Sequence, residues 1–212
     1  MIVNFGWTKY FASTNQFVKD QRVFSVPHIA DRSKYITSLL QKDLYVASAW
    51  NKCVKRVFLV ENNLFFRKGL RSEDMAWCGD LLYLMPEMAC LHNYSYIYRQ
   101  ERLNSITATV DHKHLYDIIK MIKVALQNSE KLPPNEKLIY LSFFAVQYLT
   151  LLFNLKTSRK EDPALFNDIY RLKIILENDL NFKVKLANKV SMFFGFKSLV
   201  KVLHLYGAHI RK

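Results

Sequence analysis

The sequence predicts an α+β chain, with a small sheet in its first half and a bundle of helices in its second half. Half of the 212 residues are apolar and 14% are aromatic, which is enough to build a core. Short aromatic and apolar runs typical of strands occur only before residue 110, whereas apolar residues recur at helical spacing after residue 111. We therefore expect two regions, residues 1–110 and residues 111–212.

The first region is expected to mix strands and short helices around polar loops. A helix is predicted over residues 73–85, and Pro86 directly after it would end it. Ser72 is the expected N-cap of that helix, followed by two acidic residues in the first turn. The expected elements are a strand over Ile2–Tyr10, an irregular stretch over 11–30, a helix over Asp31–Gln41, a helix over 73–85 and one or two strands over Met88–Tyr98.

The second region is expected to be helical throughout. The segment Leu138–Phe153 contains no charged residue and is apolar nearly all round, but it is shorter than a typical membrane span of about 20 residues, so we expect a buried core helix. The other expected elements are a helix carrying the stripe Leu115, Ile118, Ile119, Ile122 and Leu126, a break at Pro133-Pro134, a helix opened by Pro163, and a last helical stretch over Lys183–Tyr206, broken near Gly195.

Composition limits the compartment and the kind of site. The three cysteines follow no Cys-x-x-Cys pattern, which argues against a disulfide framework or a zinc knuckle and favours a reducing cytoplasm. The N-terminus has neither the basic nor the long apolar region of a signal peptide. Because the chain starts directly with a predicted strand, we expect that a preceding part is missing. His112 and His114 lack the spacing of a helical metal pair and are expected to be solvated.

Three local patterns are candidates for a functional site. The first is Ser48-Ala49-Trp50-Asn51-Lys52, followed by Lys55-Arg56. The second runs from Glu61 through Gly69 to Ser72-Glu73-Asp74. The third is Tyr94-Ser95-Tyr96-Ile97-Tyr98-Arg99-Gln100, followed by Asn104-Ser105-Ile106-Thr107.

In this order and spacing, the three patterns resemble the second half of the catalytic domain of bacterial family-2 glycosyltransferases, which have the GT-A fold. The resemblance covers about residues 1–110. It implies a partial GT-A-like sheet followed by the helical bundle, and an inverting transfer of a sugar from a nucleotide-sugar donor to a glycan or lipid-linked acceptor in surface polysaccharide synthesis. It also implies a divalent metal, Mg or Mn, which would stabilise the leaving diphosphate in the complete enzyme.

The resemblance assigns the catalytic base to Asp74, with Glu73 beside it. A carboxylate in the first turn of a helix is held on a rigid element near free backbone amides, which suits a positioned base. Acidic residues are also common in first turns simply because they complement the helix dipole, and the residues alone leave that alternative open.

Five further residues are candidates for contacts with substrate. Trp50 would stack on a sugar ring, or else pack in the core. Asn51 and Lys52 would bind substrate or tie down a loop, and Lys52 could also neutralise a diphosphate. Arg99 and Gln100 end a predicted strand and would form the polar rim of the cleft, although a lone arginine more often pairs with an acidic residue. We expect Trp50, Asp74 and Arg99 to converge on one concavity.

The sequence also departs from the family. It contains no Asp-x-Asp motif, no Gly-rich phosphate loop and no nucleotide-binding strand-loop-helix, so we identify no metal ligand in it. The expectation is therefore a truncated transferase that lacks its donor-binding half and is inactive alone.

The charge of the chain points to a polyanionic partner. The net charge is +13, and the stretch Lys183–Lys212 carries seven basic residues and no acidic one, interleaved with apolar residues. Such a basic amphipathic helix fits an anionic membrane surface, although its apolar face could instead pack on the preceding helices. We expect a cytoplasmic protein, peripheral on the inner face of the cell membrane.

The alternative function is a non-catalytic basic helical module that binds a membrane surface or nucleic acid. The positive charge does not occur together with aromatic residues in any known reader motif, and the sequence contains neither a helix-turn-helix nor a zinc-finger pattern. We therefore expect no nucleic acid among the partners.

Overall fold

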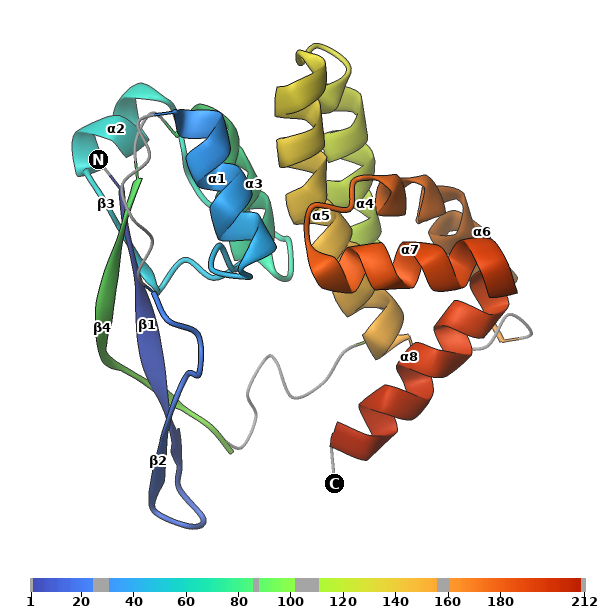
Figure 1. Ribbon diagram of the computed structural model, residues 1–212, viewed down its shortest axis with the longest axis horizontal. Coiled ribbons are helices and arrows are strands. Elements are labelled where there is room, and N and C mark those ends of the chain that lie inside the picture. The colour runs from blue at the N-terminus through green and yellow to red at the C-terminus, as the bar shows by residue number, and fades with distance from the viewer. Residues whose placement is uncertain (1, 25–30, 86–87, 102–110, 156–160, 211–212) are drawn as a thin grey trace. The chain divides into compact units, whose positions relative to one another are not determined.

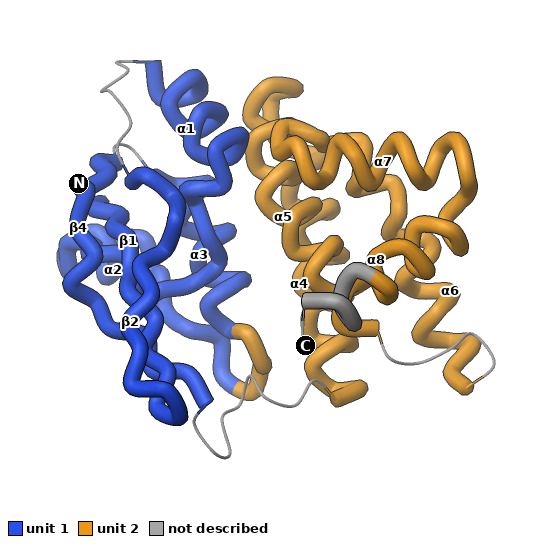
Figure 2. Tube along the Cα trace, turned by 60° about the horizontal axis from the view of Figure 1, so that its bottom comes forward, with its two compact units in different colours: residues 1–68, 73–110 blue, residues 69–72, 111–212 orange. Residues whose placement is uncertain are grey.

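The structure is a computed structural model that describes residues 2–24, 31–85, 88–101, 111–155 and 161–210. The chain forms two compact units (Figure 2). Unit 1 comprises residues 1–68 and 73–110, and unit 2 comprises residues 69–72 and 111–212. The α+β class predicted from the sequence is confirmed, because strands and helices make up unit 1 and helices make up unit 2 in the described residues.

Unit 1 is built around the central strand β1 (Ile2–Phe11), which starts and ends close to the predicted strand. Strand β4 (Met88–Arg99) runs parallel to β1 along nearly its whole length. Strands β3 (Lys52–Val54) and β2 (Gln16–Lys19) pair antiparallel with the two ends of β1 and therefore share its other edge. The sheet is small, and Figure 1 shows that the β1–β2 end extends well beyond the helices.

Strand β2 corrects the expectation that residues 11–30 are irregular. Phe11 pairs with Gln16 and Thr8 pairs with Lys19, so the chain turns back on itself in a hairpin. All four residues of β2 are exposed, and for that reason they lack the alternation of buried and exposed residues that identifies a strand from sequence. Residues 25–30 lie outside the described residues.

Two helices cover one face of the sheet at the N-terminal end of β1 (Figure 1). Helix α1 (Arg32–Gln41) begins after Asp31, whose carboxylate accepts the Lys34 N–H and caps it. Helix α3 (Glu73–Leu84) is buried on nearly all sides, and it ends two residues before Pro86, which lies outside the described residues. Arg32 donates to the carbonyls of Leu82 and Met85 at the end of α3 and so satisfies groups that a helix leaves without partners.

The start of α3 differs from the prediction. Ser72 has a φ of 54°, not the extended backbone of an N-cap residue, and its hydroxyl lies 2.6 Å from His114 Nε2. The expectation that Ser72 caps this helix is therefore wrong. The short elements β3 and α2 (Arg56–Glu61) were not predicted either, because three and six residues are too few to show a periodic pattern.

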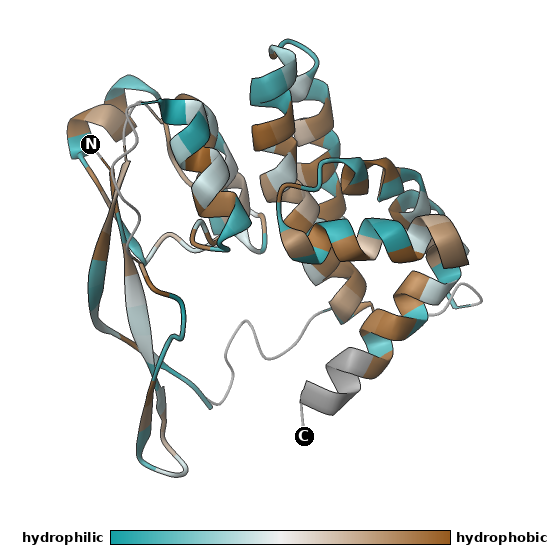
Figure 3. Cartoon of the chain, viewed as in Figure 1, coloured by the Kyte–Doolittle hydropathy of each residue, from teal (hydrophilic) through white to brown (hydrophobic). Residues whose placement is uncertain are grey.

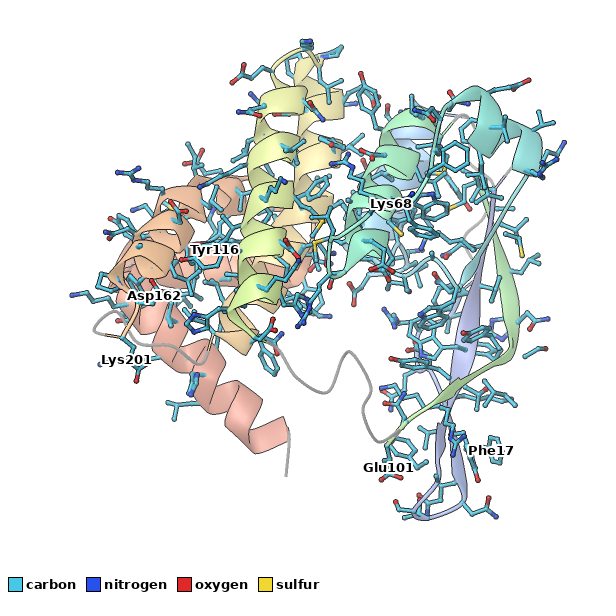
Figure 4. All side chains as sticks on the ribbon, turned by 180° about the vertical axis from the view of Figure 1, so that it is seen from behind. Phe17, Lys68, Glu101, Tyr116, Asp162 and Lys201 are labelled. Carbon is cyan, nitrogen blue, oxygen red and sulfur yellow. The ribbon has the colours of Figure 1, made fainter. Side chains whose placement is uncertain are left out.

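Unit 2 consists of a long helical pair surrounded by shorter helices. Helices α4 (His112–Ser129) and α5 (Pro134–Asn154) are joined by a tight turn through Pro133. Helix α6 (Pro163–Arg171) continues into a 3₁₀ helix, η2 (Leu172–Glu177), and Gly195, with a φ of 82°, separates α7 (Phe182–Phe194) from α8 (Phe196–Ile210). The hydroxyl oxygen of Tyr116 in α4 lies 3.5 Å from Oδ2 of Asp162, the residue before α6, and both residues are labelled in Figure 4.

Helix α5 forms the core of unit 2. Eleven of its 21 residues are buried, and Tyr148, which is completely buried, donates a 2.7 Å hydrogen bond to the Ile169 carbonyl of α6. It is the one helix in the described part of the chain that is long and apolar enough to cross a membrane, but 61% of its apolar stretch is buried inside the protein. Its environment is that of the core helix expected from the sequence.

Gly6 provides a test of the packing of unit 1. A Cβ at this position would lie 2.6 Å from the ring of Tyr94 and 3.0 Å from that of Phe24. The Tyr94 ring cannot move away easily, because its hydroxyl donates to the Arg22 carbonyl at 2.6 Å and its own carbonyl accepts from Thr8 Oγ1 at 2.9 Å. We expect Gly6→Ala to lower the free energy of unfolding by about 1–3 kcal/mol.

Urea unfolding followed by tryptophan fluorescence measures this effect in unit 1, since Trp7, Trp50 and Trp77 all lie there. The control is Gly6→Ala in a Tyr94→Ala background, where the obstructing ring is gone and the loss should mostly disappear. An equal loss in both backgrounds would show that the ring contact does not limit this position.

Candidate functional site

A buried hydrogen-bond network ties the Trp50-Asn51-Lys52 segment to the central strand. Asn51 Nδ2 donates to Asn4 Oδ1 at 2.9 Å and to the Phe5 carbonyl at 3.2 Å, and the Asn51 carbonyl accepts the Phe5 N–H at 3.1 Å. Asn4 Nδ2 in turn donates to the Leu44 carbonyl at 2.8 Å. Both asparagines are completely buried, so these hydrogen bonds replace solvent contacts that the side chains have lost.

Lys52 is held inside the same loop. Its Nζ donates to the carbonyls of Val46 and Ser48 at 2.7 and 2.8 Å and to Asn51 Oδ1 at 2.9 Å, which uses all three of its N–H groups. Nζ also lies 4.7 Å from the centre of the Tyr45 ring. The side chain is buried, and burial lowers the pKa of Lys52. Of the two roles considered for Lys52 and Asn51, these contacts are the ones expected for residues that tie down a loop.

Asp74 lies in the first turn of α3, within electrostatic range of Lys52. Burial is the main reason that the pKa of Asp74 is raised to about 6, and the neighbouring charge of Glu73 adds to the effect. The Met75 N–H and the charge of Lys52 act in the opposite direction but do not outweigh burial. Glu73 itself is exposed. One turn further along α3, burial raises the pKa of the Cys78 thiol to about 11. A partly buried carboxyl group with a raised pKa thus lies within electrostatic range of a buried lysine.

Trp50 belongs to a separate, aromatic cluster. Its ring is stacked on Tyr96 and Tyr98, with centroids 4.7 and 5.0 Å apart, and it meets Trp7 edge-on at 5.1 Å. The structure therefore groups Trp50 with Trp7 and with two tyrosines of β4.

Arg99 and Gln100 lie at the far end of β4. Arg99 is exposed, pairs in register with Tyr10, and points to the face opposite that of Tyr98. The Gln100 N–H donates to the Tyr10 carbonyl at 2.8 Å, and its side chain reaches back to the Tyr98 carbonyl at 3.4 Å. The segment Asn104–Thr107, which completes the third motif, lies outside the described residues.

Sequence reasoning missed one side-chain pair. Ser72 and His114 are 42 positions apart, yet Ser72 Oγ lies 2.6 Å from His114 Nε2 within unit 2. His114 is half-buried, so the expectation of a solvated residue is wrong for it, whereas His112 is exposed. Nearby, the Arg71 N–H donates to Asp117 at 2.9 Å and Lys113 donates to the Gly69 carbonyl at 2.8 Å, which explains why residues 69–72 belong to unit 2. No local pattern in the sequence could have identified this long-range pairing.

Among the described residues, Asp74 belongs neither to a metal-binding cluster nor to the surface hollow along β4. Among the residues that the structure describes, no group of three or more histidine, cysteine, aspartate or glutamate side chains could hold a metal ion. The divalent metal implied by the resemblance thus finds no donor set there, and we assign it no step. A surface hollow of about 620 Å³ lies along β4 and the end of β2, lined by Lys19, Asp20, His92, Asn93, Tyr94 and Ser95. Asp74 is not part of that hollow.

The chain was compared with protein-family models, with curated protein sequences and with solved structures, and nothing matches it.

The raised pKa of Asp74 predicts a specific dependence of stability on pH. Between pH 3.8 and about 6, the folded protein holds a proton on Asp74 more tightly than the unfolded chain does. The contribution of this group to stability is therefore fully present below pH 3.8 and is lost as pH rises through about 6. Relative to Asp74→Asn, the wild type should lose on the order of 1–3 kcal/mol of unfolding free energy over this range.

Chemical denaturation at a series of pH values measures the difference between the two proteins. Glu73→Gln is the matched control: it removes the neighbouring charge, so the transition should move to lower pH but should not disappear. A constant difference between wild type and Asp74→Asn at all pH values would contradict the raised pKa.

Proposed function

We propose that unit 1 carries the acceptor side of an inverting glycosyltransferase of the family-2, GT-A type, and that a donor-binding half outside these 212 residues completes the enzyme. The parallel pair β1–β4, with α1 and α3 on one face, would be the remnant of the GT-A sheet. The observation that carries the proposal is the position of Asp74, partly buried in the first turn of a helix, where burial raises its pKa to about 6.

Asp74 has the properties that a general base requires. At neutral pH a carboxyl group with this pKa is mostly ionised, yet it is a stronger base than an ordinary aspartate. In the proposed reaction Asp74 removes the proton from an acceptor hydroxyl. The hydroxyl oxygen attacks the anomeric carbon from the face opposite the leaving group, and the bond from that carbon to the nucleoside diphosphate breaks with its electron pair going to the phosphate. The configuration at the carbon is inverted, and the proton stays on Asp74.

The buried network supports Asp74 without touching the substrate. Lys52, whose three N–H groups are already used within the loop, acts through its charge, which favours the ionised form of Asp74. We therefore propose Asn51 and Lys52 as positioning residues. Trp50 lies in the aromatic cluster and Arg99 at the end of β4, so we assign neither of them a contact with the reacting hydroxyl.

A lipid-linked glycan at the inner face of the cell membrane is the acceptor that we propose. The excess of basic residues, with a net charge of +13, favours a location beside anionic phospholipids and phosphate-containing acceptors.

The proposal predicts that Asp74→Asn abolishes transfer while leaving donor binding nearly intact. With the chain combined with a donor-binding half, kcat should fall by about 10²–10⁴-fold, because the asparagine has a similar size but cannot accept the proton. The measurement is transfer of a labelled sugar from a panel of nucleotide sugars to a membrane extract, below the melting temperatures of both proteins, with donor affinity determined separately.

The control is Glu73→Gln on the exposed neighbour, which should retain most of kcat. An Asp74→Asn enzyme with nearly full kcat would show that Asp74 is only a structural residue. Robust turnover by the 212-residue chain alone would overturn the claim that a donor-binding half is needed.

A further inference from the structure

Helix α7 has apolar residues on two opposite faces, and only one of them is used inside unit 2. Val184 and Ala187 are buried against the neighbouring helices, as the packing alternative for the basic tail requires. Phe182, Leu186 and Phe193 lie on the other side of the helix and are 63%, 62% and 78% exposed. Their spacing of four and seven residues aligns them along one line of the helix surface. We call these three residues the α7 stripe.

Two more exposed apolar residues lie near the α7 stripe, where α7 ends and α8 begins. Met192 and Phe194 are 74% and 73% exposed, and the helix ends at Gly195 directly after them. Figure 3 colours this end of α7 light brown, on the hydrophobic side of the scale. Single exposed apolar residues are normal on protein surfaces, but several large ones in contiguous positions mark an interaction surface.

Lysines border the stripe. Lys185 and Lys189 are exposed on the same side of α7, and from Phe182 to Lys212 the sequence contains no acidic residue. Lys201, labelled in Figure 4, is exposed on the following helix. The surface therefore combines exposed apolar side chains with exposed lysines.

We propose that the α7 stripe docks unit 2 onto the surface of an anionic lipid bilayer. Helix α7 lies in the plane of the interface, with Phe182, Leu186 and Phe193 among the upper acyl chains. Lys185 and Lys189 extend their aliphatic stems along the apolar layer and place their ammonium groups among the phosphates and carboxylates of the headgroups. This proposal does not rest on the proposed function, since docking needs neither a donor nor an acceptor.

Two other occupants fit the surface less well. A nucleic acid would satisfy the lysines but offers nothing apolar along its phosphate backbone to cover three large side chains. A second copy of the chain, docked symmetrically through the same stripe, would bring the lysines of both copies together. An anionic bilayer complements both the charge and the apolar side chains.

Flotation of the full chain with vesicles tests the proposal. We expect binding to phosphatidylcholine vesicles that contain phosphatidylserine and much weaker binding to vesicles of phosphatidylcholine alone. Leu186→Ser/Phe193→Ser should lower the partition coefficient at least tenfold. The matched control is Val57→Ser/Phe65→Ser, which removes two apolar residues of unit 1 that are 64% and 59% exposed, and binding should be unchanged.

A second pair of variants separates local charge from net charge. Lys185→Gln/Lys189→Gln should weaken binding about thirtyfold, because each of the two lysines contributes about 1 kcal/mol near an anionic surface. Lys120→Gln/Lys137→Gln makes the same change in net charge on the exposed surfaces of α4 and α5 and should have little effect. Equal losses in the two pairs would overturn the proposal, since net charge alone would then explain binding.

A tryptophan introduced into the α7 stripe reports how deeply the stripe enters the bilayer. The three native tryptophans lie in unit 1, so Phe193→Trp adds a reporter to unit 2, and its emission should shift to the blue when phosphatidylserine vesicles are added. If the Phe193→Trp protein binds the vesicles but its emission does not shift to the blue, the stripe lies outside the bilayer and the proposal is wrong. Binding to a DNA duplex in preference to vesicles, or self-association that Leu186→Ser/Phe193→Ser abolishes, would assign the surface to those partners and overturn the proposal.

Discussion

Unit 1 depends on the hydrogen bonds that bury Asn4 and Asn51 against each other. These two amides join the central strand β1 to the loop that precedes β3, and through the Leu44 carbonyl to the segment that follows α1. A buried amide without partners would cost more than a kcal/mol, so each side chain requires the others to be in position. The network thereby defines where the loop lies on the sheet, in a part of the molecule whose strands are few and short.

The same network places a charge where an isolated charge would be unfavourable. Lys52 is 8% exposed, and its ammonium group is stabilised by three oxygen atoms of its own loop and by the Tyr45 ring. Asp74 is the carboxylate whose charge favours that of Lys52, and Lys52 in turn favours the ionised form of Asp74. Burial nevertheless dominates for both groups, raising one pKa and lowering the other. As a result, the pKa of Asp74 is about 6. This value depends on how the residue is packed and not on the residue type alone.

Unit 2 is held together by the packing of apolar helix surfaces. Its core is the apolar surface of α5 and of the helices that pack on it, and burial of that surface stabilises the unit. Helix α7 is then bound by one apolar side only, which leaves the opposite side open to solvent. The two interpretations of the basic tail, packing on the bundle and docking on a surface, are compatible because they use different faces of the same helix.

The sequence by itself determined the class of the fold, the helices of unit 2, strands β1 and β4, and the acidic pair at the start of α3. These features repeat with a helical or strand period, or lie next to a proline or glycine, so neighbouring residues are enough to define them. Only the tertiary structure decided that Ser72 pairs with His114 instead of capping α3, that the exposed segment Gln16–Lys19 is a strand, and that Trp50 stacks on Tyr96 and Tyr98. Each of these outcomes depends on a partner distant in sequence, or on which face of the sheet a side chain occupies. Local patterns carry no information about such contacts, because they form only when the core has packed.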